Sequence, residues 1–203
     1  MTDANAGDRR SVLMNALGAI ERLQRELEIL KSARREPIAI VGLGCRFPGG
    51  ADSPDAFWEL LQAGGDAIVE IPAERWPRER YYDPDPEAPG KICTRHGGFL
   101  KHVDQFDAHF FGVAPREALC LDPQQRLLLE VCWEAIEHAG YAAAALAGSR
   151  TGVYAGITLN DYGFLQKCED APDLNAYHMT GNHLSYAAGR IAHTLKLQGP
   201  ALA

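Results

Sequence analysis

The sequence predicts an α/β fold preceded by an N-terminal coiled-coil helix. Three observations carry this prediction. Short apolar runs rich in β-branched residues at 38–43 and 151–157 are typical of buried strands. An amphipathic helical pattern at 122–140 lies between them, and such alternation is typical of a mostly parallel sheet. A heptad repeat of apolar residues in 9–35 predicts a coiled-coil helix ahead of this part.

The composition is that of a globular protein and excludes several classes. The chain has 203 residues, 46% of them hydrophobic, and its net charge of −7 argues against a nucleic-acid partner. It has no run of about 18 apolar residues that would predict a membrane span, and no apolar segment of a secretory signal. The five cysteines are scattered without CxxC spacing, which predicts reduced thiols and a cytoplasmic location.

The N-terminal part is set apart by its charge and its periodicity. Residues 9–35 hold seven cations and three anions, a balance of +4, so the rest of the chain carries −11. The apolar a positions of the heptads are Leu13, Ile20 and Leu27, and the d positions are Ala16, Leu23 and Leu30. Such a helix either docks onto another helix or lies on its own domain. Heptads and basic flanks together favour docking through Leu13, Ile20, Leu23, Leu27 and Leu30.

These features divide the chain into three parts. We expect residues 1–8 to be disordered, 9–35 to form the docking helix, and 36–203 to form one domain. Pro37 ends the helix because the residue before a proline avoids helical conformation.

The run at 38–43 then predicts a buried strand. The glycines after it suggest dinucleotide binding, but Phe47 stands where that fingerprint requires its third glycine, so a nicotinamide-binding protein is only a distant alternative.

Capping signals place the helices of the domain. Ser53 and Pro54 predict a helix start, and a short strand is expected at 68–71 before a loop-rich stretch at 72–98. Asp122 and Pro123 predict the start of the strongest helix, with Gln125 closing a capping box and Gly140 at its end. The aromatic residues before this helix predict part of the core: Phe106, Phe110 and Phe111.

The C-terminal part predicts a second strand at 151–157 and a short helix or loop at 160–167. We expect 172–181 to be irregular, and a helix rich in small residues to follow at 181–197. Gly199 and Pro200 then mark a turn before an apolar segment at 201–203 that predicts the start of a core strand. Because the chain ends there, we expect that it is cut rather than finished.

No pattern in the sequence predicts a reaction centre. None of the seven histidines makes a zinc-site spacing, and Cys132 lies on the apolar face of the strongest helix. Cys45 follows a predicted strand, but the bulky Arg46 and Phe47 do not form the small-residue turn that a nucleophile elbow requires. From residue types and spacing alone, the chain is a scaffold without catalytic residues or a metal site.

Five segments follow in order: EPIAIVGLGCRFPGG at 36–50, FWELLQAGGDAIVEIPAERW at 57–76, HGGFLKHVDQFDAHFFGVAPREALCLDPQQRLLLEVCWEAIEHAGY at 96–141, TGVYAGITLNDYG at 151–163 and TGNHLSYAAGRIAHTLKLQGPALA at 180–203. Together they resemble the N-terminal part of a β-ketoacyl synthase (ketosynthase) domain of modular type I polyketide synthases. Residues 9–35 resemble the docking coiled coil that often precedes such a domain.

The resemblance implies a thiolase-like fold, of which this chain holds the first half, and a homodimer. It implies an acyltransferase that performs decarboxylative Claisen condensation. A cysteine thiolate takes the acyl chain from the phosphopantetheine of an acyl carrier protein, and a malonyl-type extender on a second carrier attacks the resulting thioester. The implied partners are the acyl carrier protein and, through the docking helix, an upstream synthase subunit. No directly bound cofactor, nucleic acid or membrane is implied.

The resemblance also assigns site residues. The nucleophile of the family lies just beyond the segment that contains Gly199 and Pro200, and its two histidines lie further on, so the resemblance places no catalytic residue in this chain. We therefore expect the chain alone to be inactive, or to act only as a docking module through 9–35. The residues that match the family's acyl pocket or dimer interface are Tyr177, Met179, Thr180 and Asn182, for which a purely structural role stays open.

Overall fold

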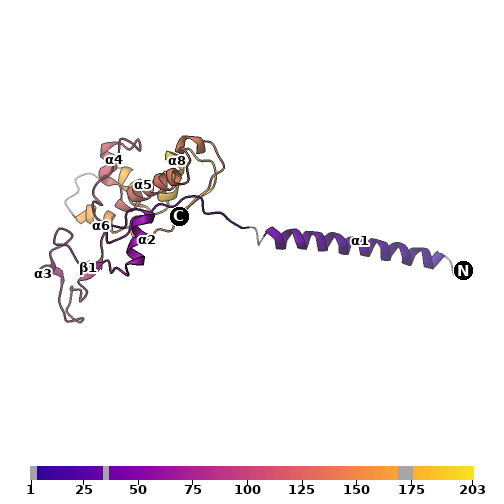
Figure 1. The fold of residues 1–203 in the computed structure, drawn as a ribbon, viewed down its shortest axis with the longest axis horizontal. Coiled ribbons are helices and arrows are strands. Elements are labelled where there is room, and N and C mark those ends of the chain that lie inside the picture. The colour runs from indigo at the N-terminus through magenta and orange to yellow at the C-terminus, as the bar shows by residue number, and fades with distance from the viewer. Residues whose placement is uncertain (1–3, 34–36, 169–175) are drawn as a thin grey trace. The chain divides into compact units, whose positions relative to one another are not determined.

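The computed structural model describes residues 4–33, 37–168 and 176–203. The chain divides into two units, Met1–Ile40 and Val41–Ala203. The first contains one helix, α1, and the second contains the other helices and strands of the described chain (Figure 1).

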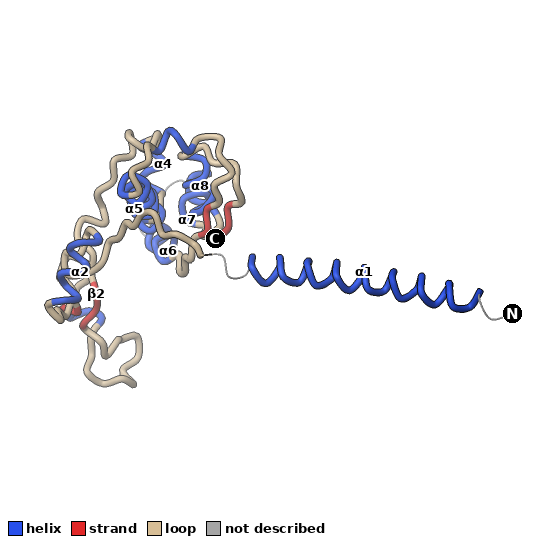
Figure 2. The backbone as a smooth tube through the Cα atoms, turned by 45° about the vertical axis from the view of Figure 1, so that its right-hand side comes forward, coloured by secondary structure: helices blue, strands red, loops and turns tan. Residues whose placement is uncertain are grey.

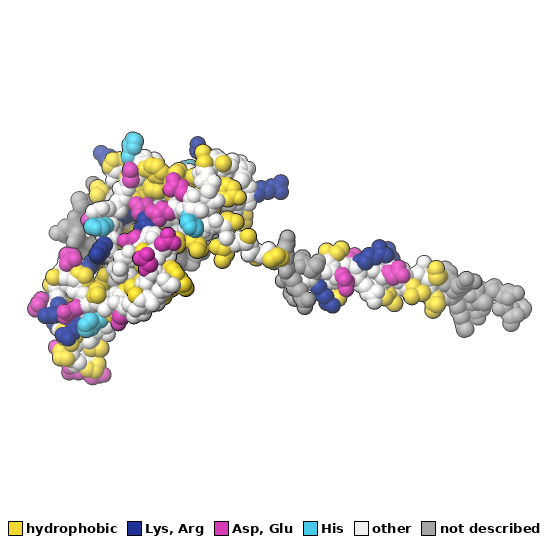
Figure 3. Space-filling model, viewed as in Figure 1, with side chains coloured by type: hydrophobic (Ala, Val, Ile, Leu, Met, Phe, Trp, Pro, Cys, Tyr) yellow, Lys and Arg dark blue, Asp and Glu magenta, His cyan; other side chains and the backbone are white. Residues whose placement is uncertain are grey.

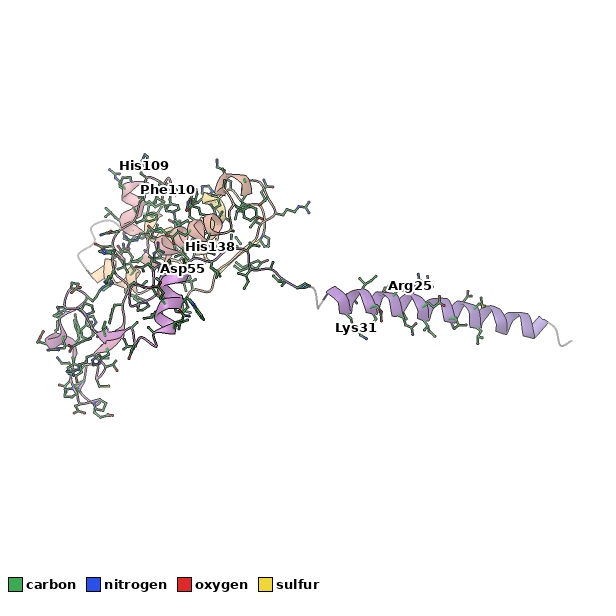
Figure 4. All side chains as sticks on the ribbon, in the orientation of Figure 1. Arg25, Lys31, Asp55, His109, Phe110 and His138 are labelled. Carbon is green, nitrogen blue, oxygen red and sulfur yellow. The ribbon has the colours of Figure 1, made fainter. Side chains whose placement is uncertain are left out.

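Helix α1 spans Ala4–Ala33 (Figure 1). It begins five residues before the predicted start, inside the stretch for which disorder was expected, so that expectation is wrong from Ala4 onward. Its heptad side chains are exposed, from 51% at Ile20 and Leu27 to 67% at Leu30. Figure 3 shows hydrophobic side chains along its surface, and Figure 4 shows Arg25 and Lys31 projecting from it. No described residue of this unit therefore covers the apolar seam.

The second unit is a cluster of helices with two small sheets (Figure 2). Helices α4 to α8 gather together, whereas α2 lies beside the β1–β2 pair. The element bounds are α2 Pro54–Gln62, β1 Ile68–Glu70, α3 Arg78–Tyr81, β2 His96–Gly98, α4 Pro115–Cys120, α5 Pro123–His138, a 3-10 turn η1 Ala143–Leu146, β3 Val153–Tyr154, α6 Asp161–Cys168, α7 Ala176–Asn182, α8 Tyr186–Thr194 and β4 Ala201–Leu202.

The parallel pairing expected from the sequence is present at the C-terminal end. Strand β3 pairs with β4 in parallel, with Val153 opposite Ala201 and Tyr154 opposite Leu202. The connection between them contains α6, α7 and α8, and α8 lies against both strands; a parallel pair requires such a crossover. The strand expected at 68–71 is β1, which pairs with β2 in an antiparallel register.

The strand predicted at 38–43 is not formed, and this prediction is wrong. Within the described residues this segment is extended without a strand partner, because the backbone at its end faces a helix instead of a ladder. The Leu43 N–H donates to Nδ1 of His138 at 3.0 Å. A Cβ on Gly42 would lie 2.2 Å from the Ala135 carbonyl oxygen, so the glycine permits direct contact with α5. The dinucleotide interpretation of these glycines therefore has no support, since they pack on a helix backbone.

The core forms where α5 and α8 meet. Its buried members are Leu129, Ala143, Ile191 and Leu195. Phe106 and Phe111, predicted as core, pack against this cluster, and their rings stack at a centroid distance of 5.4 Å. The same prediction is wrong for Phe110, which is 53% exposed. Cys132 also packs there, as its place on the apolar face predicted. The polar face of α5 is less regular than expected, because Arg126 is only 9% exposed.

The predicted caps of α2 and α5 are confirmed, with one exception. Ser53 Oγ accepts from the Ala56 N–H at 3.2 Å, and Asp122 accepts from the Gln124 N–H at 2.8 Å. Gly140 follows α5 with a φ of 76°, which explains the need for glycine after its end. The capping box is wrong: the Asp122 N–H donates to the Gly181 carbonyl and not to the Gln125 side chain, and the Gln125 amide donates to the same carbonyl.

Helix α7 lies in a stretch that was expected to be irregular. Residues 172–175 of that stretch lie outside the described residues, and Ala176–Asn182 is helical. A seven-residue helix is too short to be stable by itself, so its neighbours in the fold must supply its stability.

Candidate functional site

The C-terminal end of α7 rests against the junction between α4 and α5. The Asp122 N–H donates to the Gly181 carbonyl at 3.0 Å, and Asn182 Nδ2 donates to the Cys120 carbonyl at 3.0 Å. A Cβ on Gly181 would lie 2.4 Å from the Cys120 carbonyl oxygen, so only glycine allows this approach. The last carbonyls of a helix lack partners within the helix, and here other elements provide them.

A buried polar network completes this contact. Gln125, which is 2% exposed, donates to the Gly181 carbonyl at 2.9 Å and lies 3.5 Å from the Thr180 carbonyl. Arg190 of α8 donates to the Gln125 side-chain oxygen at 3.0 Å and to the Thr180 carbonyl at 3.3 Å. Its charge is balanced by Glu117 of α4, at 2.5 Å. Helices α4, α5 and α8 thus meet at the end of α7.

A hollow of about 350 Å³ lies over this network, between α4, α7 and α8. Its lining is partly aromatic or small, and partly polar. The first group is Ala176, Tyr177, Tyr186 and Gly189, and the second is Glu117, Thr180, Arg190 and His193. The Arg190 charge is paired with Glu117, so the hollow suits an uncharged or apolar group better than an anion.

The four residues assigned by the family resemblance lie on α7, but the structure places them differently. Tyr177 and Thr180 line the hollow together. Asn182 is 8% exposed and binds the Cys120 carbonyl, Gln166 and the His178 carbonyl. Met179 is 64% exposed. The structure thus brings two of the four together at one surface.

Sequence reasoning missed Glu117, Gln125 and Arg190 as members of this site. Gln125 was assigned to a helix cap, and Arg190 was not singled out within the helix expected at 181–197. The signal in the sequence was weak, because the three positions are up to 73 residues apart and follow no motif or helical period. Only their common contact with the end of α7 relates them.

A second hollow, of about 650 Å³, lies beside the start of α2 and along α5. Arg46 there forms a two-point ion pair with Glu134, with one contact at 2.6 Å. Glu130 lines the same hollow, and burial raises the pKa of its carboxyl, with the neighbouring Glu134 adding to the rise. Figure 3 shows acidic and histidine side chains on the visible face of this unit, and Figure 4 marks His138 on α5. Within the described residues no three metal-binding side chains come together.

Cys45 and Cys132 are structural in character. Burial raises the pKa of the Cys45 thiol despite the adjacent Arg46, and burial also raises the pKa of Cys132. A raised pKa keeps a thiol protonated and unreactive at neutral pH. Cys45 Sγ lies 3.9 Å from the Ala51 carbonyl, a contact that provides no base for the thiol.

Comparison with known proteins decides the family. Residues 35–203 match the model of the N-terminal domain of β-ketoacyl synthases. The chain belongs to the β-ketoacyl synthase family. The thiolase-like fold expected from the resemblance is confirmed by solved ketosynthases that superpose on it. The oxazolomycin ketosynthase domain of Streptomyces albus does so with a TM-score of 0.71 and 33% identity, over 81% of this chain and 28% of that one.

Two further comparisons agree. The ketosynthase from module 6 of the bacillaene synthase of Bacillus subtilis has a TM-score of 0.68 and 37% identity, over 80% of this chain and 26% of its own. One of the phenolphthiocerol/phthiocerol polyketide synthase proteins of Mycobacterium tuberculosis is 48% identical over 198 residues. These residues are 96% of this chain and 9% of that protein. This ketosynthase chain therefore corresponds to the N-terminal part of a polyketide-synthase ketosynthase domain.

Among the described residues of the ketosynthase chain, no helix combines the length and apolarity that crossing a membrane requires.

Proposed function

We propose that this chain supplies the N-terminal half of a condensing domain that extends a polyketide chain. In that reaction a cysteine thiolate attacks the acyl thioester of a carrier's phosphopantetheine and releases the pantetheine thiol. A malonyl-type extender then loses carbon dioxide, and its carbanion attacks the acyl-enzyme, forming a carbon–carbon bond and expelling the cysteine thiolate. The observation that carries the proposal is the family match, which runs through residues 35–203.

The remaining assignments follow from the same proposal. Substrates arrive on the phosphopantetheine of an acyl carrier protein, and no cofactor binds this chain directly. The domain is a cytoplasmic homodimer, and Tyr177, Met179, Thr180 and Asn182 line its acyl pocket or dimer interface. The aromatic hollow beside Tyr177 and Thr180 supports the pocket assignment, because an acyl chain needs an apolar wall. The domain comprises residues 36–203, after the docking helix at 9–35.

We propose that the isolated chain neither acylates itself nor condenses. The protonated state favoured for Cys45 and Cys132 supports this, because only the thiolate attacks a thioester. The test is intact-mass measurement of the chain and of the parent ketosynthase after incubation with acetyl-pantetheine. We expect an acetyl adduct on the parent enzyme and none on the chain. A stable adduct on Cys45 of the isolated chain contradicts the proposal, as does a parent enzyme that takes up no acyl group.

A second function, docking through α1, is favoured by one observation. The helix has an exposed heptad seam and basic residues, and no described residue of its own unit covers the seam. In a parallel pair of these helices, Glu26 at position g of one copy faces Lys31 at position e of the other. We propose that α1 pairs in parallel and presents its basic surface to an acidic helix of an upstream synthase subunit.

The docking proposal is tested with a 1–36 peptide in sedimentation equilibrium. We expect a helical dimer, weakened by Glu26→Lys or by Lys31→Glu, because each change places like charges opposite each other. The double exchange restores the attraction and the dimer. Each charge pair contributes only about 0.5 kcal/mol to the stability of the dimer. The measurement therefore requires low salt, because salt screens the interaction between exposed charges. A wild-type peptide that stays monomeric at high concentration contradicts the proposal, and a double exchange that rescues nothing contradicts the parallel orientation.

A further inference from the structure

We propose that Arg190 is a positioning residue for the acyl-pocket wall, acting through Gln125 on the end of helix α7. This inference rests on the proposed function, in which Tyr177 and Thr180 of α7 line the acyl pocket. It assigns a specificity role to Arg190 through the contacts of its side chain with helix α7.

The guanidinium of Arg190 joins the helices that surround the end of α7. Its Nε donates to Gln125 of α5 at 3.0 Å, one terminal nitrogen donates to Glu117 of α4 at 2.5 Å, and the other donates to the Thr180 carbonyl at 3.3 Å. The Arg190 side chain is 12% exposed and that of Glu117 is 21% exposed. Arginine is suited to this place because its planar donors point in three fixed directions at once.

Arg190 also fixes the orientation of the Gln125 amide. The amide oxygen accepts from Arg190, so the amide nitrogen is turned toward the Gly181 carbonyl, 2.9 Å away. Gln125 is 2% exposed, which leaves no room for water to take over either contact. Without the arginine, the buried Gln125 amide oxygen loses its donor. Nothing then holds the amide in the orientation in which its nitrogen donates to the Gly181 carbonyl of α7.

The contacts on α7 place its lining residues. Thr180 and Gly181 offer terminal carbonyls that need partners outside the helix, and the network from Arg190 supplies them. Tyr177 lies one turn before these carbonyls and shares the 350 Å³ hollow with Arg190 itself. A shift in the end of α7 therefore moves Tyr177 and Thr180 together.

The test uses the complete parent ketosynthase and two probes, acetyl-pantetheine and decanoyl-pantetheine. The rate of acyl loading is measured for each by intact mass, and the ratio of the two rates is compared between variants. For Arg190→Lys we expect the decanoyl-to-acetyl ratio to fall about tenfold, because the long chain reaches the displaced wall and the acetyl group does not. Glu117→Gln, which keeps the shape but loosens the arginine, should lower the ratio by roughly threefold.

Arg78→Lys is the matched control, because Arg78 pairs with Glu70 at the surface, away from α7. It should leave the ratio at the wild-type value. If Arg190→Lys fails to fold, Glu117→Gln decides by the same ratio. An equal fall for both probes means that Arg190 only stabilises the fold, and an unchanged ratio in both variants likewise overturns the inference. A wild-type enzyme that loads neither probe is a different failure, since it removes the proposed function itself.

Discussion

Arg46 and Glu134, 88 residues apart, form a two-point ion pair that joins the segment after Gly44 to helix α5. The Arg46 side chain is 22% exposed and also donates to the Asp52 carbonyl at 2.9 Å. The same helix face carries Glu130, one turn before Glu134. The Arg46 guanidinium therefore pairs directly with Glu134. It forms no such pair with Glu130, whose pKa is governed mainly by burial.

This arrangement predicts a pH-dependent gain from Glu130→Gln. Burial is the largest cause of the raised pKa of Glu130, and repulsion from Glu134 adds to it, while Arg46 opposes both. A carboxyl whose folded-state pKa lies above its unfolded value contributes stability below the unfolded pKa and loses it as pH rises through the folded pKa. The charged form therefore weakens the fold at neutral pH, and the glutamine removes that cost.

We expect Glu130→Gln to raise the unfolding midpoint of the parent ketosynthase at about pH 7, with the difference shrinking toward about pH 4, near the ordinary glutamate pKa. Thermal unfolding of both proteins across this range is the measurement. Glu59→Gln, at an exposed position of α2, is the control and should show no such trend. A gain of equal size at both pH values would mean that the charge of Glu130 is not its cause.

A second prediction concerns two glycines, on helices α7 and α8, that have opposite surroundings. A Cβ on Gly181 would meet the Cys120 carbonyl oxygen at 2.4 Å and the Leu121 Cα at 3.2 Å, and these are backbone atoms that cannot turn aside. Gly181→Ala should therefore cost about 1–3 kcal/mol, as overpacking does. It should also loosen α7 and lower acyl loading.

Gly189→Ala is the matched variant. It lies inside α8, and no atom comes within 4 Å of its added Cβ. Alanine should be neutral there or stabilise the helix by about 0.5–1 kcal/mol. Denaturant unfolding of both variants gives the comparison, and equal effects at the two positions would contradict the close approach at Gly181.

A third prediction concerns the behaviour of the chain by itself. Ile38, Ile40 and Val41 are 93%, 80% and 63% exposed, and Leu202 at the edge of the β3–β4 pair is 59% exposed. Apolar surface and an open strand edge of this kind favour association. The isolated chain should aggregate, or become soluble only with the rest of the ketosynthase present. A soluble monomer with a sharp, cooperative thermal transition would show the opposite.

The sequence by itself determined the features that depend on neighbours along the chain. The caps at Ser53 and Asp122, the amphipathic helix after them and the heptads of α1 follow from local hydrogen bonding and periodicity. The strand at 201–202 was also predicted, because its apolar run follows a Gly-Pro turn. The family followed from five ordered motifs, which the match over residues 35–203 confirms.

Tertiary structure alone decided the features that depend on distant partners. The segment at 38–43 has the composition of a strand, but its end at Gly42 and Leu43 lies against α5, because a strand forms only where another strand offers a ladder. Helix α7 forms where the sequence predicted irregular chain, since Gln125, Arg190 and Asn182 bind the carbonyls around it. The contact between Gln125 and Arg190 crosses 65 residues of chain, and no local pattern records which polar group will meet which carbonyl.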